Sequence, residues 1–285
     1  MTLDPRINAF RPDLADVALR DSVDAAVYAD PVLRQCWRGV VPLLDRPDIN
    51  ARQISQVRYG EFVDVFEERD DGFAWVQNRA DHYVGYLPSD GTFGDTVAML
   101  SNRVVALRTF VYPDPDIKTP PIDELTLGSF IGIVGQREKF LEMASGGFVC
   151  TAHVMATEYA NTDDYVFTAG RLLHTPYLWG GRTPKGIDCS GFVQLVLEMA
   201  GIECPRDSDQ QCAAFGDTLD AHWRDRNWRR GDIVFFPGHV GIMTGSDHII
   251  HANAHSMDVT VEPLADLVGR GNEVIAAAEA ARLTA

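Results

Sequence analysis

The sequence predicts an α+β protein in which two small β-barrels precede a domain that begins with helices and continues into an antiparallel sheet. Three observations support this fold class. Short strand-like runs separated by turn signals fill residues 33–90, and a second β-rich stretch fills residues 91–157. From residue 158 onward, helical periodicity comes first and strand-like runs follow. The 285 residues are enough for two or three compact units.

Residues 1–32 mix charged residues with scattered apolar ones and are interpreted as an N-terminal extension packed against something larger. Within it, residues 13–19 predict the start of a short helix, because Leu14, Val17 and Leu19 partly share a face.

The first β unit, residues 33–90, contains four runs rich in β-branched and aromatic residues, bounded by turn signals such as Asp70-Asp-Gly and Pro88-Ser-Asp-Gly. These runs predict strands at Ile54–Val57, Glu61–Phe66, Phe73–Gln77 and Tyr83–Leu87. Short strands at this spacing predict a small barrel.

The second β unit, residues 91–157, is of similar size and suggests a duplicated module. Its predicted strands are Arg103–Val111, Ile131–Val134 and Gly147–His153. A proline-rich loop at residues 113–121 lies between the first two, since proline is excluded from central strands.

The third unit, residues 158–285, contains the clearest helix of the chain. Phe192, Val196 and Met199 repeat at helical spacing within Cys189–Ala200, and Gln194 and Glu198 are expected to point away from the core. Gly201 is expected to end this helix. The other elements predicted here are a helix at Asp163–Leu173 and strands at Ile233–Phe236, His239–Thr244 and His248–Ala252.

Composition excludes several classes of protein. A formal net charge of −16 argues against nucleic acid as a partner. The sequence contains no run of about eighteen apolar residues, so no membrane-spanning helix is predicted. Five cysteines without a Cys-x-x-Cys pair argue against a disulfide framework or a zinc ribbon. The first residues lack the features of a signal peptide, so we expect a cytoplasmic location.

Cys189 has the setting of a nucleophile. It follows the glycine-containing loop at residues 184–188 and opens the predicted helix, where the helix dipole and unpaired backbone amides favour thiolate over thiol. The same amides offer a site for the oxyanion of a tetrahedral intermediate. A small buried residue at a helix start is the structural alternative.

His239 and His251 lie on successive predicted strands. If residues 245–247 form a three-residue hairpin loop, His239 faces position 253, His251 faces position 241, and both rings project from one face of the sheet. A loop of two or four residues would place them on opposite faces. The pair then suits a general base, His239, and a ring that orients it, His251. A zinc site is the weaker alternative because no third ligand is evident.

The blocks around these residues resemble the NlpC family of cysteine peptidases in order and spacing, over roughly residues 165–265. The resemblance is carried by Tyr177-Leu-Trp-Gly-Gly, Gly186-Ile-Asp-Cys189-Ser-Gly-Phe, Arg230-Gly-Asp-Ile-Val-Phe-Phe, Gly238-His239-Val-Gly-Ile and Ile250-His251-Ala. It implies a circularly permuted papain-like fold without cofactor or metal, in which Cys189 attacks, His239 is the base and His251 is the third, polar member.

The two upstream β units resemble the bacterial SH3-like barrels of the family's cytoplasmic dipeptidyl-peptidase branch. The resemblance implies cleavage between γ-D-glutamate and a diamino acid in small murein-derived peptides that begin with a free L-alanine. Carried over to this chain, Glu61, Tyr83 and Asp207 would hold the free amine, and Ser208 would touch the peptide. Tyr86 stands where the family usually has tryptophan.

Four further residues are candidates for the site, each with a structural alternative. Tyr177 is expected to line the site and to donate to the oxyanion, or else to be a core tyrosine. Trp179 is expected to wall the cleft or to lie in the core. Asp188 and Ser190 are expected to contact substrate or to cap the helix.

Two other functions compete with the peptidase. An amidase or acyltransferase on the same scaffold would have no use for an amine clamp at Asp207 and Glu61. A wall-binding module without catalytic activity fits the SH3-like barrels but leaves the intact Cys189, His239 and His251 set unexplained.

Overall fold

The structure is a computed structural model that describes residues 3–94, 98–218 and 226–283. The chain divides into two compact units, Met1–Ala160 and Asn161–Ala285. The second unit therefore begins within a few residues of the predicted boundary at 158.

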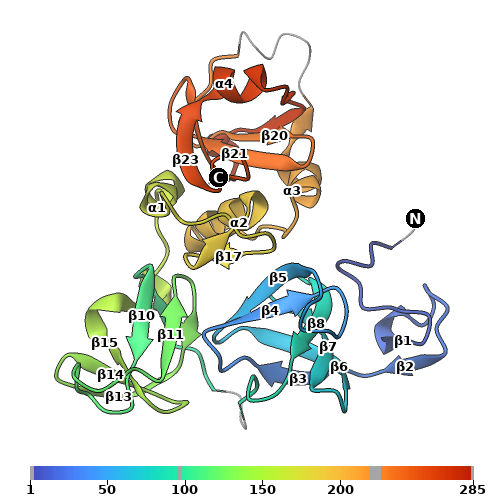
Figure 1. The fold of residues 1–285 in the computed structure, drawn as a ribbon, viewed down its shortest axis with the longest axis vertical. Coiled ribbons are helices and arrows are strands. Elements are labelled where there is room, and N and C mark those ends of the chain that lie inside the picture. The colour runs from blue at the N-terminus through green and yellow to red at the C-terminus, as the bar shows by residue number, and fades with distance from the viewer. Residues whose placement is uncertain (1–2, 95–97, 219–225, 284–285) are drawn as a thin grey trace. The chain divides into compact units, whose positions relative to one another are not determined.

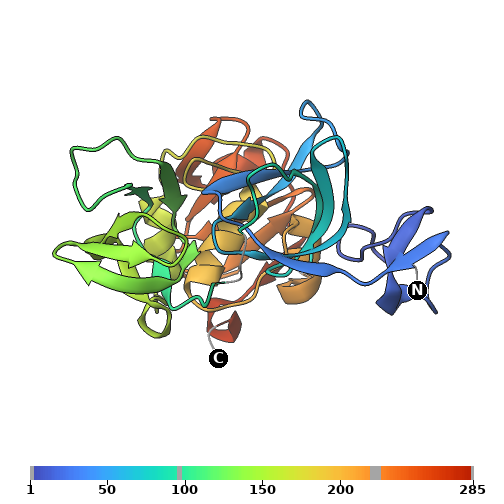
Figure 2. The ribbon, with the colours of Figure 1, turned by 90° about the horizontal axis from the view of Figure 1, so that it is seen from below.

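Six strands of the first unit form one curled antiparallel sheet in the order β3-β6-β7-β8-β4-β5, drawn in blue to teal in Figures 1 and 2. These strands are β3 (Val32–Gln35), β4 (Val40–Leu44), β5 (Gln53–Arg58), β6 (Phe62–Glu68), β7 (Phe73–Asn78) and β8 (Val84–Pro88). All four predicted strands of this barrel are confirmed to within a residue or two. Phe93 also pairs with Cys36 and packs on the barrel core, so the barrel extends past the predicted boundary at residue 90.

The N-terminal extension packs on this barrel, as expected, but it is not helical where a helix was predicted. Leu14–Asp16 form β1, which pairs in parallel with β2 (Val27–Ala29), and Val17–Leu19 form a single 3₁₀ turn. The carboxylate of Asp16 accepts from the amide of Ala18, a local bond that competes with helix formation.

The second β unit consists of three short antiparallel sheets around one apolar core. Its strands are β9 (Asn102–Val104), β10 (Arg108–Val111), β11 (Asp123–Thr126), β12 (Phe130–Ile131), β13 (Ile133–Arg137), β14 (Phe140–Met143), β15 (Phe148–Cys150) and β16 (Val154–Ala156). The predicted strand at residues 103–111 is two strands, because the amides of Val105 and Ala106 both turn to the carbonyl of His153. The predicted strand at 147–153 ends at Cys150, and a 3₁₀ turn, Thr151–His153, follows.

The second unit is α+β, as predicted, with a six-stranded sheet in the order β19-β24-β20-β21-β22-β23. The strands are β19 (Asp217–Thr218), β20 (Ile233–Phe236), β21 (His239–Met243), β22 (His248–Asn253), β23 (Asp258–Pro263) and β24 (Ala276–Ala278), and a separate small hairpin joins β17 (Arg182–Thr183) to β18 (Gly186–Ile187). The helices are α1 (Tyr165–Arg171), α2 (Cys189–Met199), α3 (Ser208–Phe215), α4 (Leu264–Gly269) and α5 (Ala280–Leu283). Among the described residues, no helix has the length and apolar character needed to cross a membrane.

Helix α2 packs on β21 and β22 (Figure 1). It is buried along almost its whole length. Gly201 ends the helix as predicted, with a φ of +78° that favours glycine. The prediction that Gln194 points away is wrong. Its side chain is fully buried, and its amide donates to the carbonyl of Cys204 at 3.1 Å. Glu198 instead accepts from Arg182 at 2.7 Å.

Candidate active site

Cys189 is the first residue of α2, and Asp188 fixes this helix start. The Asp188 carboxylate accepts from the amide of Gly191 at 2.7 Å, which caps the helix, and from the amide of Gly180 at 2.9 Å, which anchors the preceding loop. Sγ of Cys189 therefore sits at the positive end of an eleven-residue helix.

A buried arginine that the sequence interpretation missed holds Asp188 in place. Arg206 donates to both carboxylate oxygens, at 3.0 and 2.7 Å, and also to Oγ of Ser190 at 3.0 Å. The structure thus shows the capping role that was one of the two predictions for Asp188. Contact of Asp188 or Ser190 with substrate stays a prediction.

The surroundings of Cys189 favour its thiol over its thiolate. Its pKa is raised to about 12, first by burial and then by the neighbouring Asp188 carboxylate, although backbone hydrogen bonds from Val240 and Ser190 act in the opposite direction. A helix start stabilises an anion by only about 0.3–1 kcal/mol, too little to offset the burial of a charge. Burial therefore outweighs the helix start that was expected to favour the thiolate, and the proton leaves as the sulfur attacks.

His239 and His251 face each other as the three-residue loop predicts. Ile242 pairs with Ile250 and Met243 with Ile249, so β21 and β22 are joined by residues 245–247. Nε2 of His239 lies 2.7 Å from Nδ1 of His251. The two rings project from one face of the sheet, and this prediction is confirmed.

His239 and Cys189 line the same cavity of about 250 Å³, together with Tyr177, Asn253 and Arg270. Burial and the adjacent His251 lower the pKa of His239 to about 3, so its ring is neutral. Within the described part of the chain, neither Nδ1 of His239 nor Sγ of Cys189 has a side-chain hydrogen bond, so none joins the two. Catalytic hydrogen bonds of this kind often tighten only when substrate binds.

Two residues absent from the sequence interpretation extend the histidine pair. Oε1 of Glu262, on β23, lies 2.9 Å from Nε2 of His251. Arg270, which ends α4, donates to both oxygens of Glu262, to Oε2 at 2.8 Å. The alternation of Asp258, Thr260 and Glu262 with valines would have predicted β23 and placed Glu262 on one of its faces.

Tyr177 lines the cavity with Cys189, and burial raises the pKa of its hydroxyl. Donation to an oxyanion stays a prediction. Trp179 is 58% exposed, so the core alternative for it is wrong. Its role as a wall of the cleft stays a prediction.

Asp207 and Ser208 lie at the start of α3. Asp207 is the N-cap residue and forms a capping box with Gln210, and Ser208 is the first helical residue. Both side chains are half-buried. Their contact with a substrate amine or peptide stays a prediction.

Glu61 and Tyr83 lie in the first unit and are both buried there. The carboxylate of Glu61 accepts from the backbone amide of Arg58 at 2.8 Å, from its guanidinium at 2.7 and 2.9 Å, and from Asn78 at 3.3 Å. Tyr83 packs in the barrel core with 5% exposure. Both therefore have structural roles, and their part in amine binding stays a prediction.

The described residues contain no cluster of three or more His, Cys, Asp or Glu side chains that could hold a metal ion. All five cysteines are free. Of these, Cys189 shares a cavity with His239.

Comparisons with known proteins identify two segments. Residues 174–268 match the NlpC/P60 family, and residues 43–91 match the bacterial dipeptidyl-peptidase Sh3 domain. Dipeptidyl-peptidase 6 of Lysinibacillus sphaericus is 28% identical over 243 residues, covering 78% of this chain and 88% of the relative. A gamma-D-glutamyl-L-lysine dipeptidyl-peptidase of Bacillus cereus is 25% identical over 277 residues, covering 85% of this chain and 80% of that relative.

A crystal structure of an NlpC/P60 family protein from Bacillus cereus superposes with a TM-score of 0.73 at 18% identity. The match covers 87% of this chain and 99% of that protein. An NlpC/P60 endopeptidase from Photobacterium damselae gives a TM-score of 0.61 at 12% identity. At these identities the likeness shows the fold alone, and it includes both units.

Proposed function

Since the chain carries an NlpC/P60 peptidase domain behind a bacterial dipeptidyl-peptidase SH3 domain, we propose that it is a cysteine peptidase that hydrolyses the γ-D-glutamyl–diamino acid bond of small murein peptides. One observation carries the catalytic part of this proposal. Cys189, at the start of α2, and His239, whose Nε2 is bonded to His251, line the same cavity.

The geometry supports acyl transfer with a single base. Sγ of Cys189 attacks the γ-carbonyl carbon of the glutamyl residue while its proton passes to Nδ1 of His239. The oxyanion that forms is met by the backbone amides at the start of α2. When the intermediate collapses, the carbon–nitrogen bond breaks and His239 returns the proton to the leaving amine. A water molecule, deprotonated by the same nitrogen, then hydrolyses the thioester and the proton restores the thiol.

The choice of bond rests on the relatives and on a proposed amine clamp. A relative that matches over most of its length is named as a gamma-D-glutamyl-L-lysine dipeptidyl-peptidase. Asp207, in the same unit as Cys189, is the residue proposed to hold a free L-alanine amine, with Ser208 against the peptide. A carboxylate that pairs with an ammonium group discriminates against a blocked N-terminus.

The test is hydrolysis of the tripeptide L-Ala-γ-D-Glu-diamino acid, followed by chromatography of the products. Release of L-Ala-γ-D-Glu that Cys189→Ala abolishes supports the proposal. Equal cleavage of the N-acetylated tripeptide would remove the amine clamp, and unchanged kinetics in Asp207→Ala would remove Asp207 from it. If the tripeptide is not cleaved but a non-peptide amide or ester is hydrolysed, the result would favour the amidase or acyltransferase.

A cytoplasmic location forms part of the proposal, with recycled wall fragments as substrates. Fractionation of cells that make the protein tests this part. Recovery outside the cytoplasm would contradict it and would leave the chemistry of the site untouched.

A further inference from the structure

His251 contacts two side chains that favour different tautomers of its ring. Its Nε2 lies 2.9 Å from Oε1 of Glu262 and 3.4 Å from Nδ2 of Asn253. A carboxylate can only accept a hydrogen bond, so it favours a proton on Nε2. An amide nitrogen can only donate, so it favours a bare Nε2 with the proton on Nδ1.

The orientation of the Asn253 amide is fixed by its other contacts. Its Oδ1 accepts from the amide of His255 at 3.0 Å, from the amide of Ser256 at 2.8 Å and from Oγ of Ser256 at 3.1 Å. Three donors assign this atom as oxygen, so Nδ2 is the atom that faces His251. Asn253 therefore acts on His251 only as a donor.

Glu262 dominates because its contact is shorter and charged. Arg270 donates to both of its oxygens and holds the group as a carboxylate. The Arg270 guanidinium also lowers the pKa of Glu262. His251 is fully buried, and burial lowers its pKa, so its ring is neutral and carries one proton.

The proton on His251 determines the proton on His239. With Nε2 of His251 donating to Glu262, Nδ1 is a bare acceptor 2.7 Å from Nε2 of His239. That atom of His239 must then be the donor. Since the neutral ring has one proton, Nδ1 of His239 is left with a lone pair, and His239 lines the cavity shared with Cys189.

We propose that Glu262, held by Arg270, is the positioning residue that sets the tautomers of both histidines and so makes Nδ1 of His239 the base. This inference rests on the proposed cysteine peptidase activity. Without Glu262, Asn253 is the hydrogen-bond partner that the described residues leave to Nε2, and its N–H favours the reverse arrangement. His239 would then carry its proton on Nδ1, where it cannot accept the proton of Cys189.

The tautomers can be measured without substrate. Long-range ¹H–¹⁵N spectra of the histidine-labelled protein at neutral pH should show both His239 and His251 protonated on Nε2. In Glu262→Ala both rings should switch to Nδ1. Protonation of His239 on Nδ1 in the unaltered protein, or no switch in the variant, would overturn the inference whether or not the protein cleaves the proposed peptide.

Kinetics give a second test through the variant His251→Asn. The amide oxygen of asparagine takes the place of Nδ1 and accepts from His239 without any tautomer to set. We expect Glu262→Ala to lower kcat roughly 10²-fold or more in the natural background, with little change in KM, because a base in the wrong tautomer is lost. In the His251→Asn background the same substitution should cost less than about threefold.

Equal losses in the two backgrounds would overturn the inference, because Glu262 would then act through its charge or through the fold. The charged groups that bear on this network are Arg270 and Asp258, with Asp266 close to Arg270. All of them remain in every variant.

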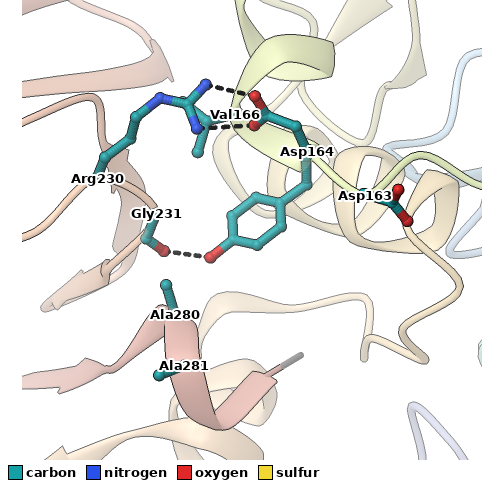
Figure 3. A pocket seen from close by; sticks show the side chains of 8 residues that line it. Asp163, Asp164, Val166, Arg230, Gly231, Ala280 and Ala281 are labelled. Carbon is teal, nitrogen blue, oxygen red and sulfur yellow. Dashed lines mark hydrogen bonds and ion pairs between the residues drawn. The ribbon is translucent and has the colours of Figure 1, made fainter. Parts of the chain in front are cut away.

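The same domain offers a matched control, shown in Figure 3. Asp164 and Arg230 form another two-pronged carboxylate–guanidinium pair, with both bonds at 2.8 Å, beside a separate cavity of about 210 Å³. Asp164→Ala removes this pair and the cap of α1. It should lower stability and leave kcat within about twofold. A comparable loss of kcat in Asp164→Ala would assign the effect of Glu262→Ala to destabilisation.

Discussion

The buried ion pair of Asp188 and Arg206, which fixes the helix start at Cys189, should lose much stability when one of its charges is removed. Asp188→Asn keeps an oxygen for the amide of Gly191 but removes the charge that Arg206 faces. The Arg206 side chain has 1% exposure, so its guanidinium would lose a buried carboxylate and face a neutral amide in its place. Removing one partner of a buried ion pair costs about 3–5 kcal/mol.

For a domain of this size such a loss corresponds to a fall in melting temperature of about 10–20 °C. The assay is calorimetry of the full chain, in which the transition of the second unit is followed. Arg206→Met should recover much of the loss when it is combined with Asp188→Asn, since the guanidinium that faced the carboxylate is then gone as well. Asp164→Asn, in the exposed pair with Arg230, should cost less than about 1 kcal/mol. A similar small cost for Asp188→Asn would show that the buried Arg206 guanidinium does not depend on the Asp188 carboxylate.

The other predictions concern protonation. Because burial raises the pKa of Cys189 to about 12, its alkylation by iodoacetamide should keep rising with pH well above 8.5, and saturation near pH 7 would show a resting thiolate. Asp188 contributes to this raised pKa, so Asp188→Asn should speed alkylation at pH 8, whereas an unchanged rate would remove that contribution. The pKa of His239 is lowered to about 3, so the base stays neutral as pH falls through 6.5. The acid limb of kcat/KM should therefore lie well below pH 6, and a limb near 6.5 would contradict an unprotonated buried ring.

Much of the fold followed from local pattern. The helix at Cys189 and the strands that carry the two histidines have strong periodicity and clear ends, and the structure places them within a residue of the prediction. The hairpin register also followed, because loop length alone decides which face each histidine occupies. The short elements of the second β unit did not follow, since their breaks depend on bonds such as those to the carbonyl of His153.

Long-range polar pairing was out of reach of the sequence. Nothing near Arg206 predicts that it reaches Asp188, and Gln194 looked solvent-facing because its partner, Cys204, lies beyond the end of the helix. The thiol was predicted to be ionised because a helix start is visible in sequence, whereas the extent of burial is not. Glu262 was missed because no strand was predicted at residues 258–263, although the alternation of polar residues with valines there indicates one.

The most direct test of the account is intact-mass spectrometry of the enzyme quenched in acid during turnover of L-Ala-γ-D-Glu-diamino acid tripeptide. We expect an added L-Ala-γ-D-Glu acyl group that peptide mapping places on Cys189, and a much slower appearance of this adduct in His239→Ala. Cleavage of the tripeptide by the Cys189→Ala variant, or an acyl group mapped to a residue other than Cys189, would contradict Cys189 as the nucleophile.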